Sequence, residues 1–85
     1  MKLIGTFLTM LRKDAGRNAS DVAEHLGYTR QMVSKWENGH ALPALDITVR
    51  WARFLGQHCS LWDAEKCTSI AISLWEWEDA FGDGE

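Results

Sequence analysis

The sequence contains one proline, two cysteines and no long uninterrupted run of hydrophobic residues. Because 46% of its 85 residues are hydrophobic and 25% are charged, the composition excludes a disordered chain and indicates one small folded domain. No apolar stretch approaches the roughly 18 residues that cross a bilayer, and the hydrophobic stretch near Met1 is too short for a secretory signal. We therefore expect a cytoplasmic protein with no membrane partner.

Cysteine and histidine are too scarce and too scattered for a metal site. A structural zinc ion needs four ligands at closely paired spacing, and the sequence has neither a CxxC nor an HxxxH pattern. A reducing cytoplasm argues against a bridge between Cys59 and Cys67, so we interpret both as small apolar groups. The histidines stand far apart, at positions 25, 40 and 58, and neither cysteine has an evident basic neighbour. We expect no metal, no cofactor, no catalytic residue and no enzymatic activity.

The net charge of −3 is unusual for a protein that binds nucleic acid, but the charges are unevenly distributed. Through Gly56, eight Lys and Arg residues stand against five acids, which gives +3. From Gln57 onward, one lysine stands against seven acids, which gives −6. One hypothesis is that this acidic tail lies against the basic half and, if that half binds DNA, competes with it.

The apolar spacing and the capping residues of the first third predict two helices. The first is expected over residues 3–15, where apolar residues recur at helical spacing: Ile4, Phe7, Leu8 and Leu11. The second is expected over residues 19–26, with Asn18 as its N-cap and Asp21 in the position of a capping-box acid. Gly27 ends this helix because glycine readily adopts a positive φ.

Three further helical segments are expected. Thr29 can cap a third helix over residues 30–37, which stops at Asn38-Gly39. Pro43 can open a fourth helix that runs to Leu55, and Ser60 can cap a short fifth in "LWDAEK". Short helices with short connections predict a compact all-α fold of four or five helices.

The segment "TSIAISLWEWE" after Cys67 has two interpretations. Its alternation of apolar and small residues fits a strand, and its β-branched and aromatic content slightly favours that structure. The segment also fits a helix, because four apolar residues recur at helical spacing and would share one face: Ile70, Leu74, Trp77 and Phe81.

The third predicted helix has two unlike sides. At about 100° per residue, one arc carries hydrogen-bonding side chains, namely Arg30, Gln31, Ser34 and Lys35. The other arc carries Met32, Val33, Trp36 and Glu37. Arg and Lys pair with guanine, and Gln pairs with adenine, so the first arc matches the groups displayed in a DNA major groove. An ordinary solvated surface helix is the alternative interpretation of this arc alone.

The segment "SDVAEHLGYTRQMVSKWENG", preceded by "IGTFLTMLRKDAG" and followed by "PALDITVRWARFLG", resembles the lambda-repressor-like helix-turn-helix family. This family includes phage Cro and repressor proteins and the xenobiotic-response-element regulators. The resemblance covers about residues 3–62 and implies a five-helix domain over residues 1–62, with a DNA-reading unit at about 18–38. Residues 63–85 then form an acidic, Trp-rich extension, either within the same domain or at a dimer interface.

The resemblance also implies roles for individual residues. Arg30, Gln31 and Lys35 would read bases, with Ser34 close enough to assist. Asn18, Thr29 and the backbone near Asn38 would approach phosphates. Because Ala19 replaces a glutamine common in the family, Arg17 and Lys13 would carry much of the remaining phosphate contact. Arg12 and Glu37 match a family pair that forms a partly buried ion pair between the first and third helices.

The fourth helix and the tail carry more hydrophobic residues than a small monomer is expected to cover. The inner stripe of this helix is predicted to be Leu45, Val49, Ala52 and Leu55. A second stripe and the tail supply candidate dimer residues: Ile47, Trp51, Phe54, Ile70, Ile72, Leu74, Trp75 and Trp77. Either residues 57–81 form a twofold homodimer interface, or the tail folds back and enlarges the core.

These observations together predict a sequence-specific DNA-binding transcriptional regulator. We expect a repressor of phage or mobile-element type that binds a palindromic operator in double-stranded DNA as a homodimer. Control would come through its own concentration or through a protein antagonist. The alternative is an antitoxin or adaptor whose Trp-rich acidic tail binds a protein partner such as a toxin.

Overall fold

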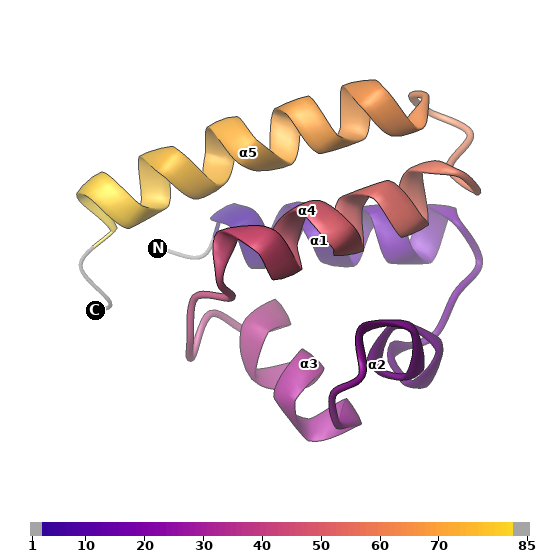
Figure 1. Ribbon diagram of the computed structural model, residues 1–85, viewed down its shortest axis with the longest axis horizontal. Coiled ribbons are helices and arrows are strands. Elements are labelled where there is room, and N and C mark those ends of the chain that lie inside the picture. The colour runs from indigo at the N-terminus through magenta and orange to yellow at the C-terminus, as the bar shows by residue number, and fades with distance from the viewer. Residues whose placement is uncertain (1–2, 83–85) are drawn as a thin grey trace.

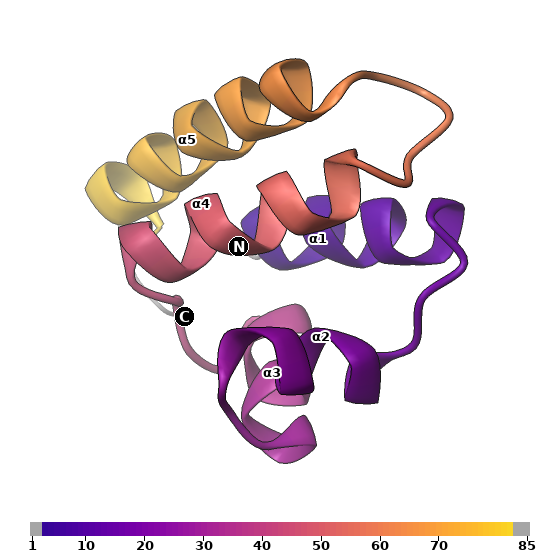
Figure 2. The ribbon, with the colours of Figure 1, turned by 45° about the vertical axis from the view of Figure 1, so that its right-hand side comes forward.

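The computed structural model describes residues 3–82, in which every regular element is a helix. The helices are α1 (Leu3–Asp14), α2 (Ala19–Leu26), α3 (Arg30–Glu37), α4 (Leu45–Gly56) and α5 (Ala64–Phe81). Figures 1 and 2 show α1 and α4 in the middle of the molecule, with α2 and α3 on one side and α5 on the other. The predicted compact all-α fold is confirmed.

Local capping defines the ends of α2 and α3 as the sequence predicts. The side chain of Asn18 accepts a hydrogen bond from the backbone N–H of Asp21 at 2.9 Å, and the Asp21 carboxylate accepts one from the N–H of Asn18 at 3.2 Å. Gly27 has a φ of 79° and ends α2. The hydroxyl oxygen of Thr29 accepts a hydrogen bond from the N–H of Met32 at 3.1 Å and so begins α3.

Helix α4 begins later than predicted, at Leu45 rather than Pro43. Ala44 is its N-cap and has no side chain that could cap the first turn, so α4 begins without side-chain capping. Leu45, predicted to lie on the inner stripe, is 37% exposed because it stands at the open start of the helix.

The core uses part of the predicted inner stripe of α4 and most of the second stripe as well: Ala52 and Leu55 are buried as predicted. Ile47 is 5% exposed and Trp51 is 0% exposed within the single chain, and the ring centroids of Trp51 and Trp36 lie 6.0 Å apart. The prediction that Ile47 and Trp51 form a surplus stripe open to a second copy is therefore wrong. Their side chains are buried because α4 packs against α1, α2 and α5 at once.

The preference for a strand after Cys67 is wrong, because this segment belongs to the 18-residue helix α5. The helix begins where the side chain of Asp63 accepts a hydrogen bond from the N–H of Lys66 at 2.7 Å. One side of α5 is buried against α1 and α4: Cys67, Thr68, Ala71 and Glu78. This burial outweighs β-propensity, a weak preference worth at most about 1 kcal/mol. A strand paired across a dimer axis is thereby excluded.

Two hydrogen bonds attach the second half of α5 to distant segments. The buried carboxylate of Glu78 accepts a hydrogen bond from the N–H of Ile4 at 3.0 Å. The indole N–H of Trp75 donates to the carbonyl of Pro43 at 2.7 Å. Since the first N–H groups of a helix have no partner within it and favour negative charge, Glu78 stabilises the start of α1.

The acidic tail does not lie across the DNA-reading unit in the part of the chain that the structure describes. Helix α5 packs on α1 and α4, whereas α3 lies on the other side of these two helices (Figure 1). Residues 64–81 thus lie against the basic half, as the hypothesis holds, but on α1 and α4 rather than on α3, so they do not cover the base-reading arc. Asp83 and Glu85, which contribute to the charge of the tail, lie outside the described residues.

The prediction that Ser60 begins a short helix is wrong, because α5 begins later, at Ala64. Ser60 instead forms hydrogen bonds with the end of α1. Its N–H and its hydroxyl donate to the Asp14 carboxylate at 2.7 Å and 3.1 Å. A hydrogen bond from the Cys59 side chain, together with the one from the Ser60 backbone, holds the pKa of the Asp14 carboxyl below its usual value. Asp14 therefore connects the end of α1 to the α4–α5 loop.

The lowered pKa of Asp14 predicts that this residue contributes to the loss of folding stability in acid. The free energy that ionised Asp14 contributes to folding is fully present above its unfolded pKa of about 3.9. It is lost as the pH falls through the folded pKa of Asp14, because the unfolded state binds the proton more readily. We expect Asp14→Asn to make the free energy of unfolding fall less steeply between about pH 5 and about pH 3. Urea unfolding at several pH values measures this slope, and equal slopes for both proteins would contradict the assignment.

Candidate nucleic-acid interface

Helix α3 presents one polar side to solvent and one apolar side to the core. Its exposed residues include Arg30, Gln31, Ser34 and Lys35, which are the proposed base-reading side chains. On the other side, Val33 is 0% exposed and Trp36 is 5% exposed. Because α5 lies on the far side of α1 and α4, it does not cover the polar arc (Figure 2). Four side chains with hydrogen-bonding groups therefore lie together on one open surface.

An ion pair fixes the end of α3 against α1. The guanidinium of Arg12 donates to the Glu37 carboxylate from Nε at 2.7 Å and from Nη2 at 3.1 Å. Its Nη1 also donates to the carbonyl of Arg17, just before α2, at 3.2 Å. Both side chains of the pair are largely buried, with exposed fractions of 15% for Arg12 and 10% for Glu37. One guanidinium thus sets the positions of three segments around the DNA-reading unit.

Gly5 was not singled out from the sequence, yet it sets the distance between α1 and α3. A β-carbon built at Gly5 would lie 2.6 Å from the carbonyl oxygens of both Trp36 and Glu37. Real contacts of this kind are essentially never so short, so any larger residue must move backbone atoms of α3. A glycine inside a helix is itself a signal, because it costs about 1 kcal/mol relative to alanine and needs a compensating reason.

Asn38 and Ser34 interact with each other at the exposed end of α3. The side-chain amide of Asn38 donates to the carbonyl of Ser34 at 2.9 Å and to its hydroxyl oxygen at 3.2 Å. The Ser34 hydroxyl accepts in this contact and keeps its own hydrogen as a donor. This arrangement leaves Ser34 able to assist at a base edge while Asn38 closes the helix.

The proposed phosphate-contacting residues differ in how close they lie to the exposed surface of α3. Lys13 is exposed and lines the same surface hollow as Asn38, where the end of α3 meets α1. Arg17 turns toward α4 instead: its Cζ lies 5.6 Å from the ring centroid of Phe54, and its Nη2 lies 3.0 Å from Nε2 of His58. Asn18 is engaged as an N-cap. Lys13 is therefore the cation next to the α3 surface, and Arg17 lies at the edge.

Two further residues support the reading unit without a prior prediction. Arg50 on α4 donates from Nη2 to the carbonyls of His25 and Leu26 at 3.4 Å, where α2 ends and its carbonyls lack partners. Tyr28, in the turn between α2 and α3, is 46% exposed, and its ring stands edge-on to Trp36 at 5.1 Å. The sequence gave no distinctive signal for the role of Arg50, because surface helices often carry cationic residues.

The cysteines and the other ligand-type side chains do not gather into a site. Cys59 and Cys67 are free thiols, and burial raises the pKa of Cys67 to about 11. Within residues 3–82, no cluster of three or more His, Cys, Asp and Glu side chains has the proximity to hold a metal ion. Nor does any helix in that range combine the length and hydropathy needed to cross a membrane.

Comparison with protein families matches residues 8–62 to a family described as Helix-turn-helix, which covers more than half of the chain. The chain belongs to the Cro and XRE type helix-turn-helix family. DNA is thus the partner of this helix-turn-helix protein, and its family is typically non-enzymatic. Searches of curated proteins and of solved structures returned no match.

The matched range shows which contacts in the helix-turn-helix protein lie outside the family region. The ion-paired Arg12 and Glu37 fall within residues 8–62, as does the whole of α3. Gly5 precedes that range, and all of α5 follows it. The close approach of Gly5 to α3 and the contact between Glu78 and Ile4 therefore involve residues that the family match does not cover.

Proposed function

We propose that this helix-turn-helix protein is a sequence-specific transcriptional regulator that acts as a repressor. Helix α3 enters the major groove, where Arg30, Gln31 and Lys35 contact base edges and Ser34 assists. The observation that carries the proposal is the division of α3 into an exposed polar arc and a buried arc that Val33 and Trp36 anchor in the core.

Phosphate contacts orient α3 in the groove. Lys13 supplies a cation next to Asn38, and the capped helix starts at Asn18 and Thr29 present backbone N–H groups that favour anions. Arg17 contributes from the edge of this surface. Because each neutralised phosphate releases counterions, affinity falls as the salt concentration rises.

The protein is proposed to bind a palindromic operator as a homodimer. An eight-residue recognition helix reaches few base pairs, so two copies are needed to specify a site. Two half-sites one helical turn apart place two α3 helices in successive major-groove faces, about 34 Å apart. A dimer bound in this way represses by occupying DNA that the transcription machinery requires, and its own concentration sets the occupancy.

Substitutions on α3 test the proposed base contacts. We expect Arg30→Ala and Gln31→Ala each to lose about 1–3 kcal/mol of discrimination at particular base pairs of the operator. Lys13→Ala is the matched control, because a phosphate contact weakens binding to all sequences alike and reduces its salt dependence. Selection of bound duplexes from a random pool supplies the operator, and titrations with operator and random DNA measure each variant. Equal losses on both DNAs for all three variants would contradict the roles.

A second candidate function is supported by an exposed aromatic pair on α5. Trp77 and Phe81 are 41% and 69% exposed, with ring centroids 5.3 Å apart. Such a surface suits a protein partner, as expected of an antitoxin or adaptor. DNA titration at low and high salt separates the two candidates. Only the regulator is expected to bind a palindromic DNA site with an affinity that falls steeply as the salt concentration rises.

A further inference from the structure

Tyr28 lies in the turn between α2 and α3, where both its backbone and its ring are fixed. Its backbone N–H donates to the carbonyl of Ala23 at 3.0 Å, and the N–H of Gly27 donates to the same oxygen at 2.9 Å. Its ring stands edge-on to the ring of Trp36, with centroids 5.1 Å apart and planes 74° apart. Tyr28 is therefore held in one position in the free protein.

The ring of Tyr28 is covered on one side only. Trp36, which it contacts, is 5% exposed and belongs to the buried arc of α3, whereas Tyr28 itself is 46% exposed. A tyrosine side chain has an apolar body and a polar tip, so it can bury the ring and leave the hydroxyl in water. Packing on Trp36 requires the ring but not the hydroxyl, which leaves the hydroxyl available to a partner.

Tyr28 stands at the flank of the recognition helix. Only Thr29, the N-cap, separates it from Arg30 at the start of α3. Since its ring packs on Trp36, it lies beside the polar arc rather than within it. A helix with its side chains is about 10–12 Å wide and the major groove is about 12 Å wide, so an inserted helix fills the groove. Side chains at its flank then meet the sugar-phosphate backbone, whereas those on the leading arc meet base edges.

The phenol hydroxyl has the chemistry of a phosphate contact. Tyrosine is among the side chains that bind DNA phosphates, and a hydrogen bond to a charged acceptor is stronger than one between neutral groups. The side chain has few rotatable bonds, and its contact with Trp36 already restricts them, so little conformational entropy is lost on binding. Because a phenol carries no positive charge, such a contact adds affinity without adding salt dependence.

We propose that Tyr28 donates its phenol hydroxyl to a phosphate of the DNA backbone beside the recognition helix and so orients α3 in the groove. This inference rests on the proposed function, because it requires α3 to occupy the major groove. Lys13 lies next to Asn38 at the end of α3, whereas Tyr28 precedes its start. One charged and one neutral phosphate contact thus hold the recognition helix at its two ends.

Tyr28→Phe tests the contact because it removes the hydroxyl and keeps the ring on Trp36. We expect an unchanged melting temperature and an affinity about three- to tenfold lower per half-site, on operator and random DNA alike. The dependence of affinity on salt concentration is expected to stay unchanged, whereas Lys13→Ala reduces it. Fluorescence titrations of labelled duplexes over a series of salt concentrations measure both quantities.

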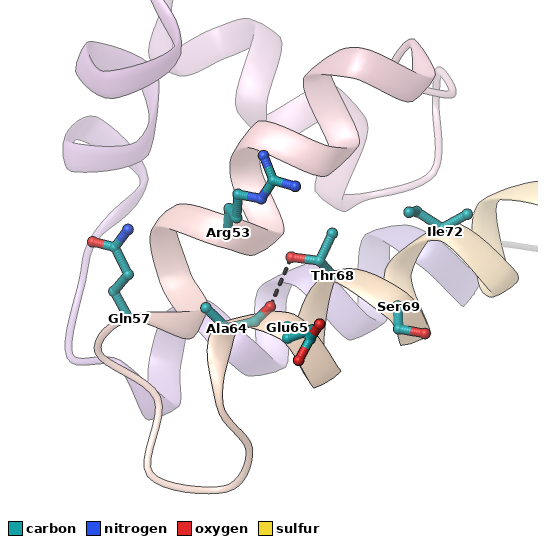
Figure 3. A pocket seen from close by; sticks show the side chains of 7 residues that line it. All are labelled: Arg53, Gln57, Ala64, Glu65, Thr68, Ser69 and Ile72. Atoms are coloured by element: carbon teal, nitrogen blue, oxygen red, sulfur yellow. Dashed lines mark hydrogen bonds between the residues drawn. The ribbon is translucent and has the colours of Figure 1, made fainter.

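Ser69→Ala is the matched control, since it also removes one exposed hydroxyl. Ser69 belongs to α5 and lines the surface hollow between α4 and α5 (Figure 3). Helix α5 packs on α1 and α4 rather than on α3. We therefore expect Ser69→Ala to bind operator and random DNA as tightly as the unmodified protein does.

Operator duplexes that carry a single methylphosphonate, an uncharged replacement for one phosphate, locate the contact. At one linkage in each half-site, we expect the unmodified protein to lose affinity until it binds no more tightly than Tyr28→Phe. The absence of such a linkage, an unchanged affinity of Tyr28→Phe, a loss confined to operator DNA, or an equal loss for Ser69→Ala would overturn the proposal. An unmodified protein that prefers no duplex contradicts the proposed function, whereas specific binding that does not depend on the Tyr28 hydroxyl contradicts only this contact.

Discussion

Glu37→Ala is expected to lower the free energy of unfolding by about 3 kcal/mol or more, because the ion pair that Glu37 forms with Arg12 is largely buried. The substitution leaves the guanidinium of Arg12 largely buried without the carboxylate that accepts from both Nε and Nη2. The carbonyl of Arg17 then remains the only acceptor of the Arg12 guanidinium within residues 3–82. Removing one partner of such a pair costs more than the pair contributes, because the other charge stays desolvated.

A double variant that lacks both charges distinguishes this stranded charge from a simple loss of packing. Arg12→Met combined with Glu37→Leu removes both charges while keeping apolar volume, and we expect the double variant to be more stable than Glu37→Ala. Urea unfolding measures all variants. A loss below about 1 kcal/mol for Glu37→Ala would show that the pair behaves like a solvent-exposed salt bridge.

Gly5→Val is expected to destabilise the fold by about 3 kcal/mol or more, and Gly5→Ala by about 1–3 kcal/mol. Helix propensity alone predicts the opposite sign for Gly5→Ala, since alanine inside a helix is favoured over glycine by about 1 kcal/mol. The steric argument prevails because the new β-carbon meets two backbone carbonyls of α3 at 2.6 Å, and backbone cannot swing aside as a side chain can.

Thr6→Val provides the matched control for Gly5→Val. Thr6 is the exposed neighbour of Gly5 on α1, so the variant introduces the same branched side chain where no backbone is displaced. Thermal unfolding ranks the variants, and operator titration below the melting range tests whether a displaced α3 also reads DNA poorly. A stabilising Gly5→Ala would refute the close contact between α1 and α3.

Features that depend on a few neighbouring residues were predictable from the sequence. The caps at Asn18 and Thr29 involve hydrogen bonds across three residues, and Gly27 acts through its own φ. The polar arc of α3 follows from helical spacing alone. These local features place α2 and α3 correctly, and with the family motif they indicate DNA binding.

Features that depend on distant contacts were not predictable in this way. The β-branched residues of α5 suggested a strand, but contact with α1 and α4 decides its structure. The side of α4 that is buried depends on which neighbours cover it, so the inward position of Trp51 was missed. Gly5 stands out in the sequence as a glycine inside a predicted helix, but that signal does not say which distant segment, here the end of α3, approaches it.

The hydrogen bond between Ile4 and Glu78 spans 74 positions of the sequence. During synthesis on the ribosome, the start of α1 must therefore wait for Glu78 to emerge before its N–H group finds this acceptor. Contacts of such long sequence separation slow folding because a large loop has to close. The nascent chain accordingly acquires its caps at α2 and α3 early, whereas closure of the whole fold follows the emergence of α5.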